Sequence, residues 1–334
     1  MRRPSSCFFA SLPPCFLCFL CFLYVLGFLC LPASLRASSL HVPPEATRAL
    51  ELIYAGHPDE ALPPARDLQK QNPDHPLGYL LEADAMWWKL YCAACQIAGD
   101  GLVDAWRRPK LDSDRNYFRL AERAIQIAEK HIGRRETAEM RFYAGMGYAM
   151  RGRLLGLRSE YRATASAGKR MREHLVRSTQ LDPNLADAYL GLGLYNYYVD
   201  TLSFIARIVR VFMGLPGGDK KTGTKQLELA AAKGRLISVE ADFYLAKCLR
   251  NYDREYARST ALFEKLVASY PANPLFRIML AGNLIRVNQL DRAEKEFGAV
   301  AQPPAPGSDT PCADWLRELA GRGLNYTRSL KVPK

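Results

Sequence analysis

The feature of this sequence that most constrains its fold is a spacing of 34 residues, which occurs near both ends of the chain. Ala49 and Ala83 are 34 residues apart, and so are Phe263 and Phe297. A fixed period of 20 to 50 residues is typical of chains that stack one structural unit on the next. The spacing of equivalent small residues is longer in the middle, with 62 residues from Ala83 to Gly145. We therefore expect an array whose central units are enlarged.

Each unit is expected to be a pair of antiparallel helices. Proline cannot continue a helix, and it also restrains the residue before it. Helix ends are therefore predicted at Asn72–Pro76, at Asp182–Asn184 and at Tyr270–Pro274, where Pro is combined with Asn, Asp or Ala. Glycines such as Gly145 and Gly193 are expected where two helices cross closely. A helix pair cannot bury its apolar face alone, so each pair must pack on the next.

Two residue patterns resemble the tetratricopeptide repeat. One is Tyr189, Leu192, Gly193 and Asn196, at spacings of three, one and three, and the other is Ala or Ser, then Phe, then Pro, as at 259–271. The chain also looks like exported bacterial repeat proteins that carry a "PGGD" segment. The resemblance implies an all-α fold: a superhelical solenoid of antiparallel helix pairs, with enlarged central repeats and a C-terminal capping helix.

The repeat period and the turn signals divide the chain into four parts. Residues 40–302 are expected to form the repeat domain, a Pro-rich link covers 303–311, and an amphipathic capping helix covers 312–330. Terminal units of a solenoid must shield an apolar face, which explains the cap. The expected units are 42–73, 76–133, 136–183, 186–235, 239–271 and 274–302.

The first part, residues 1–39, reads as an export signal. Arg2 and Arg3 precede an uncharged run, Cys15–Leu31, and the small residues Ala37 and Ser39 follow it in the spacing of a signal-peptidase site. The run is close to the shortest length that spans a membrane, so an uncleaved N-terminal anchor is the alternative. In both cases we expect an exported protein, either periplasmic or membrane-anchored and facing the periplasm.

The charge of the chain is basic but dispersed. There are 46 Lys and Arg against 34 Asp and Glu, a formal net charge of +12, and the basic residues form short clusters. A solvated surface is the favoured interpretation, and contact with a membrane or an anionic envelope polymer is the other. Nucleic acid is not expected as a partner of an exported chain.

No motif of this sequence predicts a catalytic, cofactor-binding or metal site. Cys92 and Cys95 have the spacing of a redox or metal pair, but small residues packing within a helix are the favoured interpretation. The segment 216–225 departs from a phosphate loop, because Thr224 follows Gly223 where lysine is required. None of the five histidines pairs with another at ligand spacing. We therefore expect a protein that is not an enzyme and needs no cofactor.

The resemblance to tetratricopeptide repeats also implies a concave groove, lined by one face of each first helix. Aromatic and aliphatic side chains in such a groove anchor peptides, and we expect them to be only partly covered. The function implied is a non-enzymatic scaffold that binds a protein or peptide outside the cytoplasm. The alternative is a membrane-associated envelope assembly factor that uses an uncleaved anchor and a basic surface. The expected groove residues are Leu80, Trp87, Phe142, Met146, Leu190, Leu194, Tyr197 and Tyr244.

Overall fold

The computed structural model describes residues 40–99, 101–105, 109–203, 206–207, 210–211, 213–302 and 313–332. The expected signal peptide or anchor at 1–39 and the expected link at 303–311 lie outside these residues. Helices hold 76% of the described residues, and the sheet is a single pair of short strands, so the prediction of an all-α fold is confirmed. None of the described helices is long and apolar enough to cross a membrane.

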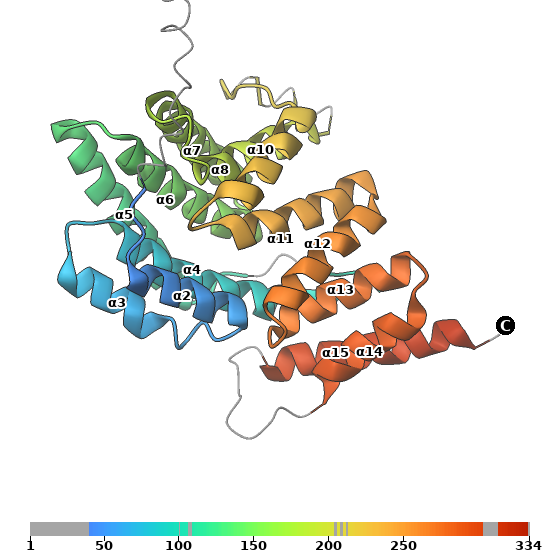
Figure 1. The fold of residues 1–334 in the computed structure, drawn as a ribbon. Coiled ribbons are helices and arrows are strands. Elements are labelled where there is room, and N and C mark those ends of the chain that lie inside the picture. Colours follow the sequence, from blue (N-terminus) through green and yellow to red (C-terminus); the bar gives the residue numbers. More distant parts are fainter. Residues whose placement is uncertain are drawn as a thin grey trace, which may run out of the picture. The chain divides into compact units, whose positions relative to one another are not determined.

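Thirteen α-helices, one π-helical turn and one hairpin make up the described part of the chain (Figure 1). The hairpin strands are β1 (Cys95–Ile97) and β2 (Val103–Ala105), and the π-helical turn is η1 (Leu249–Asp253). The α-helices are α2 (Pro44–Ala55), α3 (Leu62–Gln71), α4 (Leu77–Ala94), α5 (Ser113–Arg134), α6 (Ala138–Leu157), α7 (Tyr161–Leu181), α8 (Ala188–Asp200), α10 (Lys220–Lys233), α11 (Ser238–Cys248), α12 (Tyr256–Ser269), α13 (Pro274–Arg286), α14 (Leu290–Ala301) and α15 (Ala313–Lys331).

Local sequence explains where several helices begin and end. The Asn273 side chain accepts hydrogen bonds from the backbone N–H groups of Leu275 and Phe276, and Pro274 occupies the first helical position of α13. Thr137 caps α6 in the same way. At the other end of a helix, Gly56 terminates α2 with a left-handed backbone (φ 95°). Such caps satisfy the N–H and C=O groups that a helix leaves unpaired at its ends.

The helices pack on their neighbours in sequence, and the first helices of several pairs also pack on one another. Each α-helix contacts the next one along the chain, and α2, α4, α6, α8 and α11 also contact one another in succession. Glycine permits the closest of these approaches. A β-carbon built on Gly193 of α8 would lie 2.8 Å from Leu227 Cγ and 3.0 Å from the Gly223 carbonyl oxygen of α10. A larger residue at this crossing would push the two helices apart.

The hairpin corrects the expected environment of the two cysteines. Cys92 lies in α4, but the helix ends at Ala94 and Cys95 begins β1 with an extended backbone, so the two cysteines do not share a helix face. The hairpin is held against the end of the chain, where Trp315 Nε1 of α15 donates to the Cys95 carbonyl oxygen at 2.9 Å. Both cysteines are buried, as packing residues would be.

Residues far apart in sequence meet where the first helix pair contacts the start of α13. Asn273 Nδ2 donates a hydrogen bond of 2.8 Å to the Tyr54 carbonyl oxygen, across 219 residues of sequence. The rings of Tyr54 and Tyr270 lie 5.9 Å apart, and Gly56 is close to Pro274. The first and the last helix pairs therefore enclose a common interior together with the central helices.

Candidate functional site

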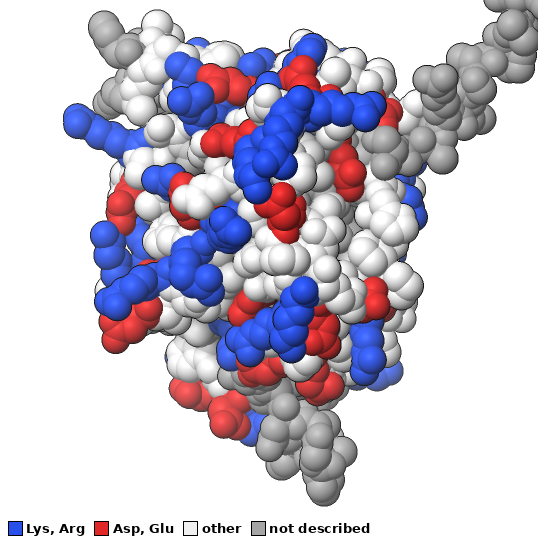
Figure 2. Space-filling model, turned by 90° about the vertical axis from the view of Figure 1, so that its left-hand side faces the viewer, with Lys and Arg blue, Asp and Glu red and all other residues white. Residues whose placement is uncertain are grey.

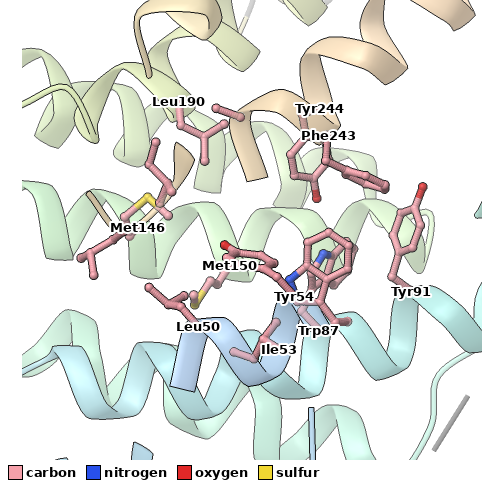
Figure 3. Close-up of a cluster of buried hydrophobic side chains, with 14 of the residues drawn as sticks. Leu50, Ile53, Tyr54, Trp87, Tyr91, Met146, Met150, Leu190, Phe243 and Tyr244 are labelled. Atoms are coloured by element: carbon pink, nitrogen blue, oxygen red, sulfur yellow. The ribbon is translucent and has the colours of Figure 1, made fainter. Parts of the chain in front are cut away.

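The residues expected to line an open groove lie in the interior instead. Leu194 is half-buried, and the other seven are buried, with at most 9% of each residue exposed. The expectation that these side chains are only partly covered is therefore wrong for seven of the eight residues, all except Leu194. Figure 3 shows four of them (Trp87, Met146, Leu190 and Tyr244) within one cluster of buried side chains. The full set is Leu80, Trp87, Phe142, Met146, Leu190, Leu194, Tyr197 and Tyr244.

Aromatic rings from four helices, α2, α4, α11 and α13, pack against one another in this interior. Trp88 of α4 lies 5.0 Å from Phe243 of α11 and 6.0 Å from Phe276 of α13, measured between ring centroids. Tyr54 of α2 contacts Trp88 edge to face at 5.9 Å. Edge-to-face packing at such distances is favourable beyond the area that it buries. The first helices thus face one another through their own side chains.

Two carboxylates and one guanidinium lie within this interior. Arg153 of α6 donates from Nη2 to Asp84 Oδ1 of α4 at 2.7 Å and from Nη1 to Glu240 Oε1 of α11 at 2.8 Å. Its Nε donates to Tyr117 Oη of α5 at 2.9 Å, and its guanidinium lies 4.6 Å from the centre of the Trp87 ring. We call Asp84, Arg153 and Glu240 the interior charge cluster.

The interior charge cluster is buried, and burial changes the pKa of its carboxyl group at Glu240. Both carboxylate residues are only 4% exposed. Burial, together with the nearby charge of Asp84, raises the pKa of Glu240 to about 8, although Arg153 acts in the opposite direction. Such groups are costly to bury and concentrate at functional sites, so they mark a candidate site on physical grounds.

A small cavity lies beside the interior charge cluster. Its volume is about 40 Å³, and its walls include Asp84, Glu240, Met146 and Met150. Tyr54 is also part of the lining, and its hydroxyl group is buried and has no hydrogen-bond partner among the described residues. Tyr54 and Met150 lie next to each other in Figure 3. A cavity of this size holds about one water molecule.

A second polar cluster joins the hairpin to α11 and η1. Asp104 of β2 accepts hydrogen bonds from Tyr91 Oη at 2.8 Å and Asn251 Nδ2 at 2.7 Å. Its carboxylate also pairs with Lys247 at 2.9 Å and with the buried Arg250 at 3.2 Å. Burial alone would raise the pKa of Asp104, but the two cations hold it well below its usual range. The Asp104 carboxylate is therefore ionised, and in this form it holds the hairpin against α11 and η1.

Reasoning from the sequence missed both polar clusters. The partners of Arg153 are 69 and 87 positions away from it, so no local spacing connects them. One signal was present: Asp84 interrupts the otherwise apolar run Ala83–Trp88, where only a paired charge is tolerated. Within the described residues, no group of three or more His, Cys, Asp and Glu is placed to hold a metal ion.

The face of the molecule in Figure 2 shows Lys and Arg interspersed with Asp and Glu. Ion pairs of this kind include Lys130–Asp74 at 2.8 Å and Arg177–Glu136 at 2.7 Å. Both are partly exposed, and such pairs contribute little to stability. On this face, then, the positive charge is not gathered into one patch for an anionic partner.

No protein-family model matches this chain, and no curated protein matches its sequence.

Proposed function

We propose that this protein is a non-enzymatic scaffold of tetratricopeptide-like helix pairs, exported from the cytoplasm, that binds a protein partner. The observation that carries the proposal is the packing order of the described helices: each contacts the next, and α2, α4, α6, α8 and α11 contact one another in succession. A solenoid stacks its repeats in this order and leaves long surfaces for binding, and in this chain the first pair also contacts the start of α13. The 34-residue spacings and the buried Ala49, Ala83, Phe263 and Phe297 agree with it.

The partner would contact the outer surface, because the interior is filled. The best anchor there is Tyr252 of η1, which is 50% exposed. Its ring lies 5.9 Å from that of Tyr197 and 5.7 Å from that of Tyr198, so its position is held by aromatic contacts. Exposed, rigidly placed tyrosines are common hot spots of protein interfaces.

The backbone around Tyr252 supports the same assignment. η1 extends α11 by a π-helical turn at its C-terminal end, and π-helical turns are rare and often found at functional sites. Arg254, which follows η1, has a left-handed backbone (φ 57°), a conformation that costs energy for a residue other than glycine. Asn251 and Arg254 are both exposed beside Tyr252, as polar groups at the rim of an interface would be.

The proposal is tested by cross-linking the tagged protein to its neighbours in the cell and purifying it, with Tyr252→Ala and Tyr161→Ala compared with the wild type. Tyr161 is the matched control, an exposed tyrosine (55%) on α7. We expect Tyr252→Ala to lose about tenfold in capture of the specific neighbour, since a hot spot is worth about 1–3 kcal/mol. The melting temperature should stay near that of the wild type.

Two results would count against parts of this proposal. If no neighbour is enriched over an unrelated exported protein, the scaffold function is wrong. If the Tyr252→Ala variant captures the neighbour as well as the wild type does, the proposed binding surface around Tyr252 is wrong, but the proposed scaffold function is not contradicted. Fractionation of the same cells separates the alternatives for the N-terminal segment, because a cleaved protein would enter the soluble periplasmic extract and an anchored one would stay with the membranes.

A further inference from the structure

The interior charge cluster contains two carboxyl groups but only one cationic group. Among the described residues, the charged groups that act on Glu240 are Asp84 of α4 and Arg153 of α6. The other polar side chains around Arg153 include three neutral tyrosines: Tyr54 of α2, Tyr117 of α5 and Tyr244 of α11. Two carboxylates thus share a single guanidinium, and ionisation of both would leave one uncompensated negative charge in a buried place.

An uncompensated buried charge is expensive, and a carboxyl group avoids it by taking up a proton. The geometry permits this, because Arg153 uses separate nitrogens for its two carboxylates and can keep its bond to Asp84 when Glu240 is neutral. The raised pKa of Glu240, caused first by burial and then by the charge of Asp84, agrees with a proton held at that side chain.

We propose that the interior of this protein contains a binding site for one proton, at the Glu240 carboxyl group beside Asp84 and Arg153, and that loss of the proton loosens the packing of α11 on α4 and α6. This inference is independent of the scaffold function. The interior charge cluster is one of the direct links between these three helices. Charging Glu240 therefore weakens the contact between helices from the first and second halves of the chain.

The cavity gives the ionised carboxylate a source of hydration. Asp84, Glu240 and Tyr54 line the cavity, and the buried Tyr54 hydroxyl group has no hydrogen-bond partner among the described residues. A water molecule placed there can bridge the hydroxyl group and a carboxyl oxygen. Proton release then draws water toward the interior rather than breaking the fold outright.

The direction of the pH effect follows from linkage. Glu240 has a raised pKa in the folded protein, against an ordinary value of 4.5, so the folded state binds the proton more tightly than the unfolded state. This stabilisation is fully present below the ordinary pKa and is lost as the pH rises toward about 8. Relative to Glu240→Gln, the folding equilibrium constant of the wild type should fall up to tenfold per pH unit in this window and then level off.

The experiment measures urea unfolding from pH 5 to pH 9.5 for the wild type, Glu240→Gln and Asp84→Asn. Glu122→Gln is the control, since Glu122 forms a partly exposed pair with Arg151 at 3.3 Å. We expect the wild type and the control to lose stability together as the pH rises, while Glu240→Gln lacks this dependence. If the free energy of unfolding depends on pH in the same way for the wild type and Glu240→Gln, the proposed proton site is wrong.

A second measurement uses the wild type alone and remains informative if the variants fold poorly. Trp87 stacks on Arg153, so its fluorescence should report the charge of the cluster. We expect a reversible change in tryptophan fluorescence of the folded protein with a midpoint near the pKa of Glu240, about 8. A flat signal between pH 6 and pH 9.5, with the fold intact, would contradict the proposal.

Discussion

Replacement of Arg153 by methionine is expected to lower the free energy of unfolding by about 3–5 kcal/mol at pH 7. Methionine retains much of the aliphatic volume of the arginine stem but removes the cation that pairs with both Asp84 and Glu240. The phenol oxygen of Tyr117 loses its donor at the same time. The quantity to measure is the urea midpoint, followed by circular dichroism, with the slope of the transition checked for change.

The matched control replaces the entire interior charge cluster with neutral side chains: Arg153→Met, Asp84→Asn and Glu240→Gln together. Neutralising a whole buried ion group is often far less harmful than removing one member. We expect this triple variant to recover most of the stability that the single change loses. A single variant as stable as the wild type would show that the two carboxylates do not depend on Arg153.

Truncation of Phe142 to alanine is expected to cost about 3–5 kcal/mol, as for other large side chains removed from a core. Phe142 is 1% exposed and packs against Tyr143, with ring centroids 5.3 Å apart. It also lines the cavity beside the interior charge cluster, so its loss would enlarge an existing void. Thermal and urea unfolding both report the loss.

The control for Phe142 is Tyr161→Ala, since the exposed Tyr161 ring should cost less than about 1 kcal/mol when truncated. A groove residue would behave like this control, because removing an exposed ring empties no core. Equal melting temperatures for the two variants would place Phe142 on a surface and contradict the filled interior.

Much of the local structure could be predicted from the sequence, because its causes are local. Pro73, Pro76 and Pro271 lie between consecutive helices, Pro274 begins α13, and Gly193 lies at a close helix crossing. These features depend on backbone geometry and on volumes at neighbouring positions. The face with Trp87 and Tyr197 was implied by the resemblance to tetratricopeptide repeats, and its expected exposure was wrong, since both residues are buried.

The closure of the interior could not be predicted, because it depends on contacts across the whole chain. A repeat pattern shows which face of a helix is apolar. It does not show whether the first helices of distant repeats meet, because that depends on the small rotation between neighbouring repeats, summed over the whole array. The bond between Asn273 and Tyr54 spans 219 residues. The three-residue strands β1 and β2 were missed because they are too short to show an alternating pattern.

The central claim, that the first helices face a filled interior, is tested most directly by thiol labelling at Leu190. Leu190→Cys places a thiol at a buried position, and Tyr252→Cys places one at an exposed position on η1. Reaction with iodoacetamide under native conditions is followed at each site by mass spectrometry of the corresponding peptide. We expect the thiol at 190 to react at least about a hundredfold more slowly, because it must wait for the structure to open. Equal rates at the two positions would show an open groove and contradict the account.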